Sequence, residues 1–145
     1  MFHTILLPTD GSALADHAIA TAIAFARLNH AKLIGLSVAQ PLPLAPVSEG
    51  GIVFDVSVYQ QQMQDAARHH VDKIGAAARA ADIPFEGLVT VSASPHQDIV
   101  ETAVKYNCDI ILMASHGRTG LNKFFLGGET QKVLAHTTLP VMVLR

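Results

Sequence analysis

The chain has 145 residues, of which 50% are hydrophobic and 15% are charged, and its formal net charge is −2 at pH 7. This length suits one domain spanning residues 1–145, and a domain near this size buries about 68–70% of its unfolded surface. The hydrophobic content excludes a disordered chain. The small negative charge gives no general attraction to nucleic acid or to anionic lipid.

Neither the single cysteine nor the N-terminal segment indicates secretion or membrane insertion. Cys108 has no partner for an intrachain disulfide or a CxxC pair, so we expect it to be a small buried hydrophobe beside a strand. The first residues lack the basic and apolar regions of a signal peptide, and no stretch approaches the roughly 20 apolar residues of a membrane span. We therefore expect a cytoplasmic protein.

The first part of the chain predicts a strand, a helix, a second strand and a long loop. Residues 2–7 are a short apolar run, typical of a strand buried on both faces. Ser12 then suits the N-cap of a helix whose apolar positions recur to about residue 26. A second apolar run covers residues 33–38. Residues 39–58 contain three prolines and a Gly-Gly pair, and they predict a long surface loop.

The middle of the chain predicts a helix over residues 59–77 and a strand over residues 85–92, both from the spacing of their apolar residues. Ser94, Pro95 and Gln97 then mark a helix start, with serine at the N-cap, proline at N1 and glutamine at N3. This combination predicts a capping box.

The last part of the chain completes an alternating pattern. We expect a strand at residues 109–113, a polar loop at 114–126, a short helix from Gly127 to about residue 136, and a strand at 141–144. Five strands that alternate with four helices indicate an α/β protein with an open parallel sheet and helices on both faces. Ligands of such sheets sit beyond the carboxyl ends of the strands, where the strand order reverses.

The turn after the first strand contains an acidic residue in a ligand-binding position. Asp10 is a possible acceptor for ribose hydroxyls, as acidic residues are in other nucleotide sites. It also suits a purely local role, in which the carboxylate accepts backbone amides two residues on. The local sequence leaves both interpretations open.

The turn after the fourth strand is polar and rich in glycine. Gly117 and the Gly127–Thr130 segment would let backbone amides approach an anion, and a helix N-terminus adds partial positive charge. Arg118 and Lys123 would add full charges, so a triphosphate fits across this turn. The alternative is a loop that needs its glycines only for positive φ angles.

Four segments together resemble the universal stress protein family. They are Leu-Leu-Pro-Thr-Asp-Gly-Ser near the start, Met113-Ala-Ser-His-Gly-Arg-Thr-Gly, Leu126-Gly-Gly, and Leu139-Pro-Val-Met-Val-Leu-Arg145. The resemblance covers the whole chain in order. It implies an open five-stranded sheet in the order 3-2-1-4-5, like that of the adenine nucleotide α-hydrolases. It also implies a dimer, and one branch of the family binds ATP.

The ATP-binding branch carries the pattern G-x2-G-x9-G-[S/T], which this chain matches at two of four positions. Ala114 replaces the first glycine and Gly128 replaces the final serine or threonine, while Gly117 and Gly127 are present. A lost hydroxyl bond to a charged phosphate costs about 1.5–3 kcal/mol, which weakens binding about tenfold to a hundredfold.

The resemblance assigns a role to each part of the site. Asp10 would hold the ribose and Val38 would line the adenine pocket, while the amides of Gly117 and of Gly127–Gly128 would hold phosphates. Thr130 would offer a substitute hydroxyl, and Glu129 would repel phosphate unless Mg²⁺ intervenes. The residues expected around ATP, with or without Mg²⁺, are Pro8, Thr9, Asp10, Val38, Met113, Ala114, His116, Gly117, Arg118, Gly127, Gly128, Glu129 and Thr130.

Other chemistries have weaker support. The chain lacks the Walker A, GxGxxG and GxSxG patterns. His69 and His70 are adjacent on a helix and point about 100° apart, so we expect a solvated pair rather than a metal site. His116 suits hydrogen bonding within its loop, and a role as catalytic acid or base is the alternative. We expect at most slow ATP hydrolysis.

The final strand would lie at an apolar sheet edge, which invites pairing with another chain. We expect a homodimer through Val141, Met142, Val143 and Leu144. The alternative is an edge shielded by a loop or by Arg145. Three functions stay open. The first is an ATP-binding stress-response module, and the second is a dimeric interaction protein of the same fold that binds no nucleotide. The third is an enzyme that acts on an adenylated or phosphorylated small molecule, with His116 as the acid or base.

Overall fold

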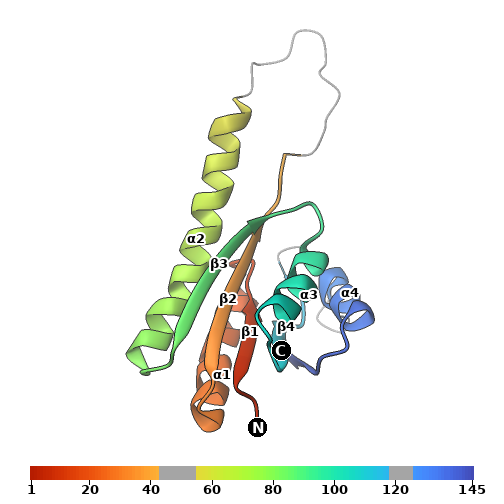
Figure 1. The fold of residues 1–145 in the computed structure, drawn as a ribbon. Coiled ribbons are helices and arrows are strands. Elements are labelled where there is room, and N and C mark those ends of the chain that lie inside the picture. The colour runs from red at the N-terminus through yellow and green to blue at the C-terminus, as the bar shows by residue number, and fades with distance from the viewer. Residues whose placement is uncertain (43–54, 118–125) are drawn as a thin grey trace.

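The computed structural model describes residues 1–42, 55–117 and 126–145, and in them five strands alternate with four helices (Figure 1). In chain order the elements are β1 (Thr4–Pro8), α1 (Ala13–Asn29), β2 (Lys32–Ala39), α2 (Val56–Ala80), β3 (Phe85–Val91), α3 (Pro95–Lys105), β4 (Ile110–Ala114), α4 (Gly128–His136) and β5 (Val141–Leu144).

The strands form one parallel sheet in the order β3-β2-β1-β4-β5, which confirms the predicted fold class and strand order. β1 lies at the centre, where Ile5 is paired with Leu33 of β2 and with Ile110 of β4. β3 and β5 are the two edges. The strand order therefore reverses between β1 and β4, where ligands of doubly wound sheets bind.

Helices α1 and α2 cover one face of the sheet, and α3 and α4 cover the other (Figure 1). Successive residues of β1 alternate between the two cores: Ile5 and Leu7 pack with α1 and α2, whereas Leu6 packs against the other layer. All three side chains are buried. A central strand with core on both faces needs apolar residues at every position, which explains the unbroken apolar run.

The helix starts confirm some of the local predictions and correct one. Ser12 is the N-cap of α1, and its Oγ accepts the amide of Ala15 at 3.2 Å. Ser94 is at the N-cap of α3 with Pro95 at N1, but the predicted capping box is wrong because the Ser94 hydroxyl accepts no helix amide. That hydroxyl lies 3.4 Å from His96 Nδ1. The Gln97 side chain instead donates to Glu101 at 2.9 Å.

The loop predicted over residues 39–58 is too long at both ends. Ala39 still belongs to β2, and α2 begins at Val56 rather than at residue 59. Asp55 provides the missed start signal, since its Oδ1 accepts the amide of Ser57 at 3.0 Å as an N-cap does. Residues 43–54 lie outside the described part of the chain.

Helix α2 is the longest element, with 25 residues, and its first turns extend past the strands (Figure 1). Its buried residues begin only at Ala67. Among the described residues, none of the helices combines the length and the apolar character needed to cross a bilayer.

Cys108 is buried beside β4, as the sequence predicts. Burial, and secondarily the negative charge of Asp109, raise the pKa of its thiol to about 11. The thiol is therefore protonated at neutral pH and is a poor nucleophile.

We predict that Cys108 in the folded protein reacts slowly with a thiol-specific disulfide reagent at pH 8. A thiol with that pKa is ionised in about one molecule in a thousand at this pH, and burial also blocks access. The measurement is the release of chromophore with time, compared with the same protein in concentrated urea. Equal rates in the two conditions would contradict the burial of Cys108.

Candidate functional site

The two turns singled out by the sequence meet beyond the carboxyl ends of β1 and β4. These strands pair side by side at the centre of the sheet. Gly117, three residues after β4, lies so close to the β1 turn that a Cβ on it would overlap Oδ2 of Asp10. We call this place the Asp10–Gly117 junction. The predicted site requires these two turns to lie close together, and they do.

The β1 turn is held by a short series of hydrogen bonds. The amide of Thr9 donates to the Leu36 carbonyl at 2.8 Å, and Thr9 Oγ1 accepts the amide of Gly11 at 3.2 Å. Asp10 Oδ1 accepts the amide of Ser12 at 2.9 Å. Asp10 thus has the turn-forming role, while its Oδ2 is directed toward Gly117. The turn-forming interpretation of Asp10 is therefore confirmed, and its role toward a ribose stays a prediction.

His70 of α2 also lies at this turn, which corrects the interpretation of His69 and His70 as a solvated pair. Gly11 has φ +73°, and a Cβ on it would overlap the imidazole of His70. His70 is half-buried, whereas His69 is exposed. The sequence already indicated that His70 is partly buried, because it lies four positions before Ile74, on the apolar face of the helix.

The start of α4 is tied to the end of β4. The amide of Gly127 donates to the Ser115 carbonyl at 2.7 Å, and the Thr130 hydroxyl donates to the Ala114 carbonyl at 3.1 Å. Thr130 is buried. Two donors expected to face phosphate are therefore used within the protein. The amides of Gly128 and of the next two residues have no carbonyl of α4 to bond, as in the first turn of any helix.

Gly127 and Gly128 differ in the space around them. A Cβ on Gly127 would lie 2.9 Å from Cα of His116, so this position accepts only glycine without a backbone shift. A Cβ on Gly128 would meet no atom within 4 Å, and this residue is exposed. The departure from serine or threonine at position 128 therefore leaves room for the missing side chain.

Four other expected residues lie around the same edge. Pro8 ends β1, Val38 is half-buried near the end of β2, and Met113 is buried near the end of β4. Nδ1 of His116 lies 3.1 Å from the Ser115 hydroxyl, so this nitrogen is engaged within its own loop. Arg118 and Lys123 lie outside the described residues.

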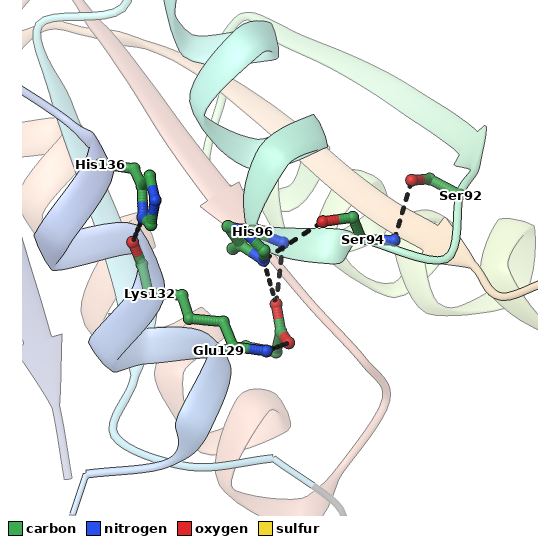
Figure 2. A network of polar contacts seen from close by, with 6 residues as sticks. All are labelled: Ser92, Ser94, His96, Glu129, Lys132 and His136. Atoms are coloured by element: carbon green, nitrogen blue, oxygen red, sulfur yellow. Dashed lines mark hydrogen bonds and ion pairs between the residues drawn. The ribbon is translucent and has the colours of Figure 1, made fainter.

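Glu129 lies at the start of α4 but caps the neighbouring helix α3 (Figure 2). Its Oε2 accepts the backbone amide of His96 at 2.8 Å and lies 3.2 Å from Nδ1 of the same residue. Its Oε1 lies 3.3 Å from the ammonium of Lys132. The carboxylate thus satisfies the N-terminus of α3, in place of the Ser94 hydroxyl.

The surroundings of Glu129 favour its charged form. Partial burial raises the pKa of the carboxyl group, but the His96 amide and the nearby Lys132 together outweigh burial and hold the pKa below its usual range. The negative charge next to the predicted phosphate site is therefore opposed by one ammonium group and one helix N-terminus.

Other parts of the described structure offer weaker sites. An open pocket of about 380 Å³ lies at the amino ends of β2 and β3, lined by residues that include Arg27, His30 and Asp82. Ligands of doubly wound sheets bind at the opposite, carboxyl ends of the strands.

Within residues 1–42, 55–117 and 126–145, no three His, Cys, Asp or Glu side chains are grouped to hold a metal ion.

The fold and the junction define a doubly wound α/β domain whose switch point lies between β1 and β4. The chain belongs to the universal stress protein family, whose model matches residues 1–145. A universal stress protein of Thermus aquaticus is 31% identical over 146 residues, with full coverage of both chains. The structure of the Methanocaldococcus jannaschii protein MJ0577 is 28% identical with a TM-score of 0.79, over 99% of this chain and 96% of that chain.

Several structures of similar fold contain adenine nucleotides. A universal stress protein in complex with cAMP is 24% identical, with a TM-score of 0.71, over 99% of this chain and 97% of that chain. An Arabidopsis thaliana member with AMP bound has a TM-score of 0.70, and an Archaeoglobus fulgidus member in complex with dAMP has 0.63. At 16–24% identity these are likenesses of fold.

We predict that Glu129→Ala lowers the free energy of unfolding at pH 7 by about 0.5–1 kcal/mol. This is the lower half of the usual cost of losing a helix cap, because 41% of the Glu129 side chain is exposed. Glu129→Gln keeps an acceptor for the His96 amide and should lose less. Lys132→Ala, which removes only an exposed ion pair, should cost about 0–0.5 kcal/mol.

The destabilisation caused by Glu129→Ala should decrease as the pH falls. The pKa of Glu129 is lowered in the folded state, so the contribution of its carboxylate to stability is fully present above the unfolded pKa of about 4.3. The contribution is lost as the pH falls through the folded pKa. Urea unfolding at a series of pH values measures the difference between wild type and variant, and a difference that grows toward acid pH would contradict the assignment.

Proposed function

We propose that this chain is a cytoplasmic stress-response module that binds an adenine nucleotide, ATP first of all, at the Asp10–Gly117 junction. The observation that carries the proposal is the close approach of Asp10 to Gly117: a Cβ added to Gly117 would overlap Oδ2 of Asp10. This contact joins a carboxylate suited to ribose hydroxyls with a glycine turn suited to phosphates. The adenine nucleotides in structures of similar fold support the choice of ligand.

Each part of the nucleotide has a matching group in this proposal. The ribose hydroxyls bond Asp10, and the adenine packs near Val38 at the end of β2. The phosphates approach Gly117 and the first amides of α4, starting with Gly128, where the helix dipole favours anions. Because the Gly127 amide and the Thr130 hydroxyl already donate to carbonyls at the end of β4, we assign those two groups to holding the start of α4 rather than to binding phosphate.

The proposed chemistry is binding, with hydrolysis slow at most. Mg²⁺ bound with the phosphates would reduce their repulsion from Glu129, whose carboxylate is also held on α3. Nδ1 of His116 is engaged with the hydroxyl of Ser115, which is buried, so we assign this pair no role in activating water.

The test of the proposal is calorimetric titration of the purified protein with Mg-ATP, AMP, cAMP and Mg-GTP. We expect saturable binding of the adenine nucleotides and weaker binding of GTP. The absence of any binding at millimolar ATP would overturn the proposal. Steady ATP turnover well above about 0.1 s⁻¹ would instead indicate an enzyme, since typical turnover numbers are 1–10³ s⁻¹.

We predict that Gly128→Ser strengthens ATP binding by about tenfold to a hundredfold, through one added hydroxyl bond to a charged phosphate. The side chain fits, because a Cβ at position 128 meets nothing within 4 Å. Gly128→Ala is the matched control, since it adds the same Cβ without the hydroxyl. Equal affinities for the serine and alanine variants would show that phosphate does not lie at this position.

The second candidate function is a dimeric interaction protein that binds no nucleotide. The observations in its favour are Ala114 in place of a glycine and the internal bonds of Gly127 and Thr130. Negative calorimetry together with a stable dimer would support this candidate.

We also propose that the protein dimerises through β5. This strand is a half-buried apolar edge of the sheet. The carbonyls of Pro140 and Leu144 bond amides of β4 and of the residue after it, at 3.0 and 2.7 Å. Backbone groups alternate in direction along a strand, so those of Val141 and Val143 face the open edge.

We predict that Val143→Pro converts the dimer to a monomer while the sheet stays intact. Proline removes the amide at the open edge, and edge strands tolerate proline there. Met142→Pro is the contrasting variant, since it removes an amide directed at β4 and should destabilise the fold. Sedimentation measures the mass, and circular dichroism measures the fold. A wild-type monomer, or a dimer that survives Val143→Pro, would contradict this interface.

A further inference from the structure

The imidazole of His70 packs directly against the backbone of the β1 turn. A Cβ on Gly11 would overlap the ring, and the nearest ring atom is Nε2. Gly11 has φ +73°, a conformation that favours glycine. The ring therefore occupies the space that a side chain at position 11 would fill, and it contacts the residue directly after Asp10.

The helix that carries His70 is firmly held at this point. Ala67, Val71 and Ile74 are buried around it, with exposed fractions of 4%, 1% and 0%. A side chain anchored on such a rigid element restricts the turn that it touches. Asp10, the residue before Gly11, approaches Gly117 through its Oδ2.

We infer that His70 is a positioning residue for nucleotide binding, which acts through Asp10. The inference rests on the proposed function: His70 holds the Gly11 turn so that the Asp10 carboxylate points at the ligand. The contact of His70 is with the turn and not with the nucleotide. Helix α2 thereby becomes part of the binding machinery, although it lies on the face of the sheet opposite to α4.

The first experiment compares His70→Ala with His69→Ala. The two histidines are neighbours on α2, but His70 lies against Gly11 whereas His69 is exposed, so His69→Ala is the matched control. We expect His70→Ala to weaken Mg-ATP binding by about tenfold, the lower end of the loss expected when one hydrogen bond to a charged group is broken. His69→Ala should leave the affinity unchanged. Equal affinities for both variants and wild type would overturn the inference.

The second experiment tests whether His70 acts through Asp10. Asp10→Asn removes the charge but keeps a side-chain acceptor for the turn. If His70 only orients the carboxylate, adding His70→Ala to Asp10→Asn should weaken ATP binding no further. Fully additive losses would show that His70 acts by another route, such as general destabilisation.

A ligand-free measurement separates this inference from the proposed function. In amide NMR spectra without nucleotide, His70→Ala should shift the signals of Asp10, Gly11 and Ser12, and His69→Ala should not. Failure of wild type to bind ATP would overturn nucleotide binding, and His70 would then hold the turn without positioning a ligand group. Unchanged turn signals in His70→Ala would overturn the inference even if wild type binds ATP.

Discussion

The arrangement of this domain depends on the parallel pairing of β1 with β4 at the centre of the sheet. β1 is followed by a helix on one face, and β4 is followed by a helix on the other. The segments that follow β1 and β4 therefore lead to opposite faces of the sheet. The turns that begin these segments lie side by side beyond the carboxyl ends of the two strands. Asp10 and Gly117 approach each other because both follow neighbouring parallel strands that end at the same edge of the sheet.

At the start of α4, some hydrogen-bond donors are used within the protein and others have no partner in the helix. An amide at the helix N-cap and a buried hydroxyl at Thr130 bond carbonyls at the end of β4, which fixes the helix relative to the sheet. Glu129 points away to the N-terminus of α3 and joins the two helices on that face (Figure 2). At the described start of α4, the backbone amides of the first helical turn are still available to an anion, and they do not depend on side chains.

The sequence predicted well those interactions that join residues only a few positions apart in the chain, because such interactions depend on local residue types. Ser12 caps its own helix, and the burial of β1 on both faces follows from its apolar run. The capping box at Ser94 failed although the residue types are right. The Gln97 amide donates to the Ser94 carbonyl, and a carboxylate 35 positions away from Ser94 accepts the amide of His96. A charged acceptor forms a stronger hydrogen bond than a neutral hydroxyl, so the distant partner prevails.

The amino-acid sequence by itself determined the order of strands and helices, the parallel sheet with its two cores, and the two turns that carry the candidate site. These features follow from apolar periodicity and turn chemistry, which act over a few residues. Only the tertiary structure decided that His70 lies against Gly11, that Glu129 caps α3, and which donors near Gly127 are already used. Contacts between side chains far apart in the chain depend on how whole elements pack, and no local pattern encodes that packing.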